Sequence, residues 1–107
     1  MSVAFHIPNA PDSPYIPIAS EAFFNKYWAK KSALEGLDFI SQFGLGVDVD
    51  VENLPDIISE LEKLYDKIPS YNDVPINEKS EWLGRISNLI TALKRFLDQE
   101  HFQGFIG

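Results

Sequence analysis

Three acidic residues stand at alternate positions near the middle of the chain: Asp48, Asp50 and Glu52. On an extended strand, residues two apart lie on the same face, so the three carboxylates would be close together. Carboxylate oxygens are ligands that Ca²⁺ prefers, but the calcium-loop pattern is not met. Asn53 stands where that loop needs glycine, and Ser59 where it needs glutamate. The pattern therefore favours a solvated or protein-binding face over a metal site.

Residues for other kinds of chemistry are few. The chain has no cysteine, and its two histidines, His6 and His101, show none of the spacings of zinc sites, although they would approach each other if the terminal segments paired. No nucleophile motif of the G-x-S-x-G type is present. The segment 44–46 begins like a dinucleotide-binding loop, but Val49 replaces its third glycine. We therefore expect no catalytic residue, no cofactor and no metal, and keep a small metal-dependent enzyme as an alternative.

Acidic residues are concentrated in one part of the chain. Residues 35–66 hold nine acidic residues and one basic residue, a net charge of −8, whereas the remaining 75 residues are nearly balanced. A run of charge is typical of a solvated face. It would also steer a basic partner and raise its association rate. The predicted partner-binding residues are Asp48, Asp50, Glu52, Asp56 and Glu60.

A cluster of aromatic residues precedes the acidic segment. Lysines are interleaved with Phe23, Phe24, Tyr27 and Trp28, a mixture that is also found on surfaces that stack single-stranded nucleic acid. Aromatic residues on one helical face are more typical of a core. The net charge of −7 also disfavours nucleic acid, because phosphate binding needs a surplus of lysine and arginine. We expect these residues to form part of the core.

The elements that position these residues begin with short strands. Apolar residues alternate with polar or small ones over 2–7 and 45–51, which predicts two half-buried strands. Residues 15–18 form a second short extended segment, which Pro17 limits to an edge. The tail, 101–107, is apolar, and we expect it to pack as an edge strand beside the first strand.

The first helical region is predicted in two parts. Ser20 is suited to cap a helix that begins at Glu21, and a break is expected near residues 30–33. Ser32 and Glu35 form a capping-box pattern that can start a second helix. The buried stripe of that second helix would consist of Leu34, Leu37 and Ile40.

Two longer helices follow. Apolar residues at helical spacing over 51–68, from Leu54 to Tyr65 and Ile68, predict a helix capped by Asp50 or Asn53. The last helix is expected to start after Asn77 as its cap and to run to about Glu100, with Trp82 and Leu97 on its apolar face. The predicted fold class is α+β: three to four helices on one face of a small sheet of two to four short strands, in a single compact domain, 1–107.

The chain resembles the small bacterial immunity proteins of contact-dependent and other polymorphic toxin systems. The resemblance lies in its size, its acidity, its lack of cysteine and the helix sequence LPDIISELEKL. The resemblance implies a cytoplasmic, non-enzymatic protein that neutralises a cognate toxin domain by binding it. No apolar run approaches the roughly 20 residues that span a bilayer, so no membrane partner is expected. The alternative is a homo-oligomeric structural or assembly protein, such as a homodimer, in contact through its apolar tail and the Trp82 helix.

Overall fold

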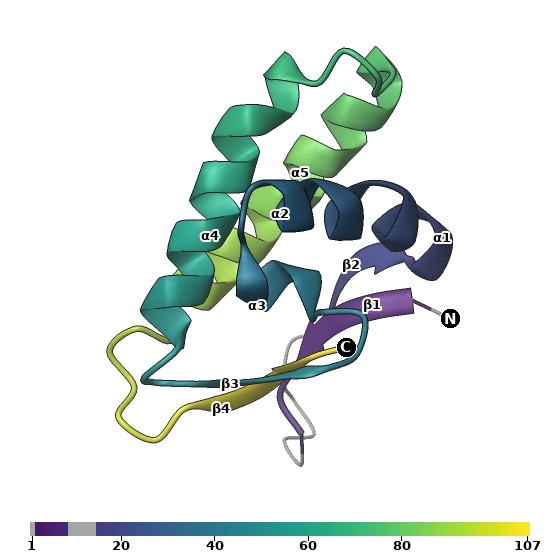
Figure 1. Ribbon diagram of the computed structural model, residues 1–107. Helices are drawn as coiled ribbons and strands as arrows, with labels where there is room; N and C mark the ends of the chain where they lie inside the picture. The colour runs from purple at the N-terminus through teal and green to yellow at the C-terminus, as the bar shows by residue number, and fades with distance from the viewer. Residues whose placement is uncertain (1, 9–14) are drawn as a thin grey trace.

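A four-stranded antiparallel sheet forms one layer of the domain in the computed structural model, which describes residues 2–8 and 15–107. Its strands lie in the order β2-β1-β4-β3 (Figure 1). They are β1 (Ser2–His6), β2 (Ile16–Ser20), β3 (Val47–Asp50) and β4 (Gln103–Ile106). Together with the helices they form a single compact α+β domain, as predicted.

The C-terminal tail is an interior strand. It pairs with the first strand as predicted, Phe5 standing opposite Ile106, but it also pairs with β3, so the expectation of an edge strand was wrong. Gly104 allows this central position, because a Cβ atom there would lie 2.8 Å from the Phe5 ring. Strand β4 therefore links the N-terminal strand, β1, to β3, the strand of the acidic segment.

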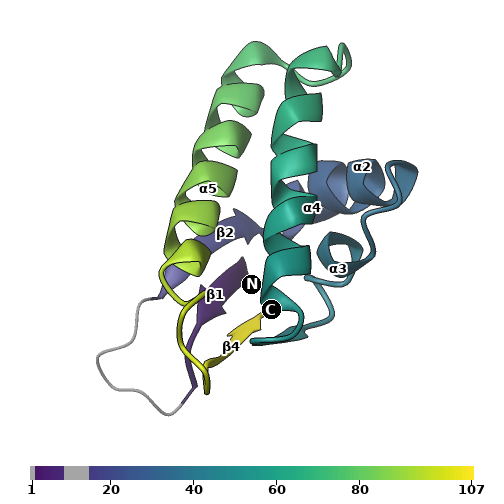
Figure 2. The ribbon, with the colours of Figure 1, turned by 90° about the vertical axis from the view of Figure 1, so that its left-hand side faces the viewer.

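The helices cover one face of the sheet, and the α4–α5 pair extends away from it (Figure 2). Their bounds are α1 (Glu21–Phe23), a π-helical segment (Phe24–Trp28), α2 (Ala29–Leu34), α3 (Asp38–Ser41), α4 (Leu54–Lys67), a 3-10 turn (Ile68–Ser70) and α5 (Ile76–Lys94). None of the helices in the described ranges is long and apolar enough to cross a bilayer.

The first helical region runs without the predicted break, from α1 through the π-helical segment to α2. Ser20 caps it as expected, accepting the Phe23 N–H at 3.1 Å. Ser32 does not start a second helix: it is buried inside α2 and its Oγ donates to the Ala29 carbonyl at 3.1 Å. The wider π turn shifts the face that follows it, and Leu34 is left 74% exposed. The helix ends before Gly36, whose φ of +72° favours glycine.

The two long helices differ from expectation at their ends. Asn53 does precede α4, but its side chain makes no cap hydrogen bond. Asn77 is not a cap, because α5 begins at Ile76 after Pro75. The helix ends at Lys94 rather than Glu100, and Tyr65 and Leu97, both predicted for the apolar faces, are 40% and 46% exposed.

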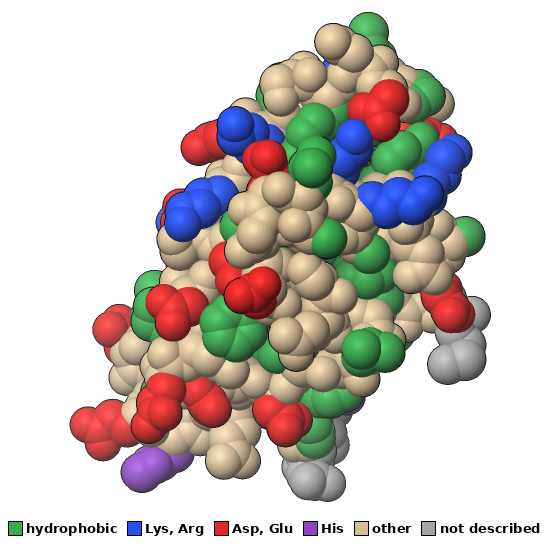
Figure 3. Space-filling view, viewed as in Figure 1, with side chains coloured by type: hydrophobic (Ala, Val, Ile, Leu, Met, Phe, Trp, Pro, Cys, Tyr) green, Lys and Arg blue, Asp and Glu red, His purple; other side chains and the backbone are tan. Residues whose placement is uncertain are grey.

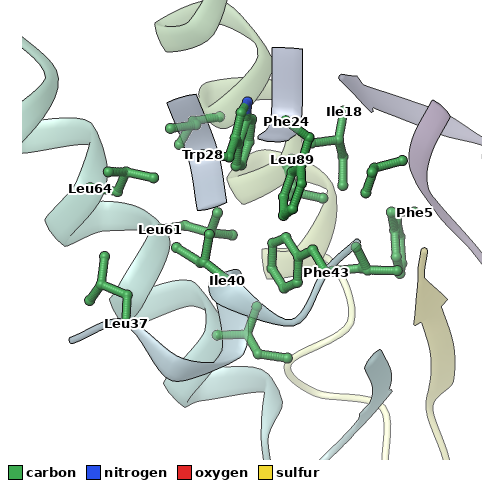
Figure 4. Packing of buried hydrophobic residues seen from close by; sticks show 14 of the residues in the cluster. Phe5, Ile18, Phe24, Trp28, Leu37, Ile40, Phe43, Leu61, Leu64 and Leu89 are labelled. Atoms are coloured by element: carbon green, nitrogen blue, oxygen red, sulfur yellow. The ribbon is translucent and has the colours of Figure 1, made fainter. Parts of the chain in front are cut away.

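The aromatic cluster lies in the core. Phe24, Tyr27 and Trp28 are buried, as expected, and Figure 4 shows Phe24 and Trp28 among side chains from both layers. Trp82 of α5 completes the cluster, with ring centroids 5.8 Å from Tyr27 and 6.1 Å from Trp28. These rings therefore hold the helices together and are not open to stack bases.

Candidate functional site

The predicted acidic residues are arranged along one edge of the sheet and the start of α4. Val47 and Val49 of β3 are buried, so the alternation directs Asp48 to the outer face, where it is exposed. Glu52 follows in an exposed turn, and Asp56 is exposed in the first turn of α4. We call these three exposed residues, together with the half-buried Asp50, the acidic surface; its members are Asp48, Asp50, Glu52 and Asp56.

Asp50 has a structural role within that surface. Its Oδ1 accepts the N–H groups of Glu52 and Asn53, each at 2.9 Å, which fixes the turn between β3 and α4. Asn53 returns the contact: its Oδ1 accepts the Asp50 N–H at 2.9 Å, and its Nδ2 donates to the Asp48 carbonyl at 2.8 Å. The Asn53 amide thus occupies backbone groups on the free side of β3 and makes that edge a poor template for another strand.

Glu60 is used inside the domain. Its two carboxylate oxygens accept the N–H groups of Phe39 at 3.3 Å and Ile40 at 3.1 Å, in the first turn of α3. A carboxylate at a helix start satisfies N–H groups that lack partners and complements the helix dipole. Of the five predicted residues, Asp48, Glu52 and Asp56 are therefore the ones whose side chains are exposed and without such a role.

A hollow of about 380 Å³ lies on the acidic surface. Asp48 and Asp50 line it together with Pro8 and, from the neighbouring strand, Gln103. Gln103 stands opposite Asp50 in the β3–β4 ladder, so its amide is held beside the carboxylates. Two carboxylates and an amide oxygen around a hollow suit a lysine or arginine side chain, which carries several N–H donors.

No salt bridge found in the described ranges involves a residue of the acidic surface. No lysine or arginine occurs between residues 32 and 62. The salt bridges found in the described ranges involve other acids: Glu35, Glu62, Asp73 and Glu81. Figure 3 shows Asp and Glu side chains gathered on the lower part of this face without Lys or Arg, whereas both kinds of charge occur on the upper part. A region that carries charge of one sign produces a directed field.

The connection from α5 to β4 adds two acidic side chains to the same end of the molecule. The sequence analysis did not predict this contribution. Because Gln103 pairs with Asp50, the chain before β4 lies beside the turn that follows β3 (Figure 1). Asp98 and Glu100 of this connection are exposed. Only the strand pairing brings these acids near residues 48–56, so the charge pattern along the chain could not reveal them.

No metal-binding arrangement is present in the described part of the chain. Groups of three or more His, Cys, Asp or Glu side chains suited to a metal are absent there. His6 stands opposite Phe105 in the sheet, with their rings 5.5 Å apart, so the register does not pair it with His101.

No family model, curated protein or solved structure matches the chain. The chemistry of the site therefore has to be derived from its own residues, which are suited to bind cationic side chains.

Several of the apolar side chains expected at a homodimer contact are buried within the domain. Trp82 is fully buried, and Phe102 and Ile106 of the tail are buried as well. The other sheet edge, β2, carries Pro17, which lacks an N–H, and the Pro17 carbonyl accepts Arg85 Nη1 at 3.3 Å. A homodimer contact made by Trp82, Phe102 or Ile106 would require these side chains to leave the core.

Proposed function

We propose that this chain is a non-enzymatic binding protein that docks a basic protein on its acidic surface. In the manner of the immunity proteins that it resembles, the partner would be a toxin domain that is neutralised in the cytoplasm. The observation that carries this proposal is the hollow lined by Asp48 and Asp50, with the exposed carboxylates of Glu52 and Asp56 following in the chain, on backbone that Asp50 and Asn53 hold in place. A rigid cluster of like charge pre-organises the site for a cationic partner.

Binding in this mode is expected to depend on charge position more than on net charge. A lysine or arginine of the partner would enter the hollow between Asp48 and Asp50, where both carboxylates can accept its N–H groups. Glu52 and Asp56 would act from the rim by attracting the partner. Charges of this exposed kind are screened within about 10 Å at 0.1 M salt and about 3 Å at 1 M salt.

A capture experiment tests the proposal. Immobilised protein is incubated at low salt with a lysate of the cells that encode it, and bound proteins are identified by mass spectrometry. The triple variant Asp48→Asn, Glu52→Gln, Asp56→Asn is compared with wild type; Asp50 is retained because it holds the turn. We expect wild type to capture one strongly basic protein that elutes as salt rises, and the triple variant to lose it.

A matched control variant separates the effect of charge position from the effect of net charge. The control variant removes the same number of negative charges at exposed positions elsewhere, on α4, on α5 and in their connection. Its substitutions are Asp66→Asn, Asp73→Asn and Glu81→Gln. This control is expected to capture the basic protein as wild type does. Equal loss in both triple variants, or no basic protein bound to wild type at low salt, would contradict the proposal.

A further inference from the structure

The face of the sheet that points away from the helices carries a row of aromatic rings. The helices pack on the other face (Figure 2), against buried side chains such as Phe5 and Ile106. Because side chains alternate along a strand, His6 and Phe105 point to the open face. Their ring centroids lie 5.5 Å apart. Tyr15, just before β2, extends the row, because its ring centroid lies 6.2 Å from that of His6.

The acidic surface continues this row across the sheet. Asp48 stands opposite Phe105 in the β3–β4 ladder, and Phe105 in turn stands opposite His6 of β1. Residues that face each other on neighbouring strands have Cβ atoms about 4.5–5.5 Å apart, so the Asp48 and Phe105 side chains are neighbours on the open face. Asp50 and Gln103, which line the acidic hollow, form the next pair on that face. The rings and the hollow therefore belong to one continuous surface.

The Phe105 ring is held in place by the turn that leads into β3. A Cβ atom at Gly46 would lie 2.7 Å from this ring, and the φ of +101° at Gly46 favours glycine. The Gly46 N–H donates to the Gln42 carbonyl at 3.1 Å, which fixes the turn. Phe105 is nevertheless only half-buried, and Tyr15 is 64% exposed. Ordered rings that remain accessible lose little freedom on association, which suits them to contact another molecule.

The charges around the rings select a cationic occupant. None of the four strands carries a lysine or arginine. A second copy of this chain would bring its own Asp48 and Asp50 against the same acids, and the phosphates of a nucleic acid would also be repelled. A guanidinium group fits the surface better, because it is planar, stacks on aromatic rings and bonds to a carboxylate through two parallel N–H groups. Arginine is also found over aromatic rings more often than lysine.

We propose that the basic partner docks on the open face of the sheet through an arginine whose guanidinium group stacks on the Phe105 ring and pairs with Asp48. This inference rests on the proposed function, because Asp48 belongs to the acidic surface, and it adds the aromatic row to the contact. An exposed contact between a cation and a ring contributes about two- to fivefold in affinity. The site should therefore prefer arginine to lysine by about that factor.

The test uses two synthetic peptides as probes, one of alternating arginine and glycine and one of alternating lysine and glycine, with equal length and charge. Isothermal titration calorimetry at low salt gives both affinities. We expect wild type to bind the arginine peptide about two- to fivefold more tightly than the lysine peptide. Phe105→Leu, which keeps an apolar side chain but removes the ring, is expected to abolish this preference. Tyr15→Leu, at a position that contributes little to the core, is expected to reduce it.

Tyr65→Leu is the matched control. Tyr65 is 40% exposed on α4 and lines a separate hollow together with Glu62 and Asp66, so it too combines a ring with acids, away from the sheet. This variant is expected to keep the wild-type preference for arginine. Thermal unfolding of the three variants shows whether any of them acts through stability; if Phe105→Leu does, Tyr15→Leu decides the test.

The outcomes distinguish the two proposals. Equal affinity of wild type for the two peptides, or no binding of either at low salt, would overturn the arginine inference. An unchanged preference in Phe105→Leu and Tyr15→Leu, or an equal loss in Tyr65→Leu, would overturn it as well. A wild-type dimer in light scattering that Phe105→Leu dissociates would assign the face to a second copy instead. A basic protein captured through the acidic surface, while the peptides bind equally, would reject this inference and leave the proposed function intact.

Discussion

Replacing Trp82 by alanine is expected to lower the free energy of unfolding by about 3–5 kcal/mol, the usual cost of removing a buried aromatic side chain. Trp82 is fully buried at the centre of the aromatic cluster, with ring centroids 6.1 to 6.3 Å from Phe23, Trp28 and Tyr71. Domains of this kind are stable by about 5–15 kcal/mol in total, so the variant should be close to unfolding. Urea denaturation followed by circular dichroism measures the loss.

Trp82→Phe is the matched variant for this prediction. The Trp82 Nε1–H is buried and has no hydrogen-bond partner in the described ranges, so phenylalanine removes an unsatisfied donor as well as part of the ring volume. An unpaired buried donor costs about 1–3 kcal/mol, which offsets part of the lost packing. We expect Trp82→Phe to cost much less than Trp82→Ala. Equal losses in both variants would contradict this account of the core.

The second large effect concerns the rate of partner binding. Neutralising Asp48, Glu52 and Asp56 together is expected to slow association with the captured basic protein by at least tenfold at low salt, because a clustered field steers the encounter. At about 1 M salt the wild-type and variant rates should converge, since exposed charges are then screened within about 3 Å. Stopped-flow measurements over a range of salt concentrations provide the comparison.

The dissociation rate supplies the control for that measurement. Charges at a rim act mainly on association, so the double variant Glu52→Gln, Asp56→Asn should leave the dissociation rate within a few-fold of wild type, whereas adding Asp48→Asn, which removes an acceptor from the hollow, should raise it. A variant that associates as fast as wild type at low salt, or whose defect persists at high salt, would show that the acidic surface does not steer the partner.

Much of the fold follows from local patterns in the sequence. Strand β3 is recognisable because Val47 and Val49 alternate with acidic residues, and the helix start at Glu21 because Ser20 can cap it. The continuous first helix could not be predicted in the same way. Helical phase arguments assume a constant turn, and the π-helical segment at Phe24–Trp28 changes that phase.

The roles within the candidate site depend on contacts between distant parts of the chain. Glu60 looks like another acid on the helix face, but it caps α3 some 20 residues away, which no spacing along α4 reveals. Asp98 and Glu100 reach the same end of the molecule only because β4 pairs with β3. Local charge patterning thus located the acidic segment, whereas the structure decides which of its carboxylates are free to bind.

The most direct test of the central claim is an amide chemical-shift map of the ¹⁵N-labelled protein titrated with the captured basic protein. If the acidic surface is the binding site, the perturbed signals will be those of β3, of the turn at residues 51–53 and of the first turn of α4. Signals from the first half of α5, around Glu81, are expected to stay unchanged. Perturbations confined to α5 and the end of α4, with none between Asp48 and Asp56, would contradict it.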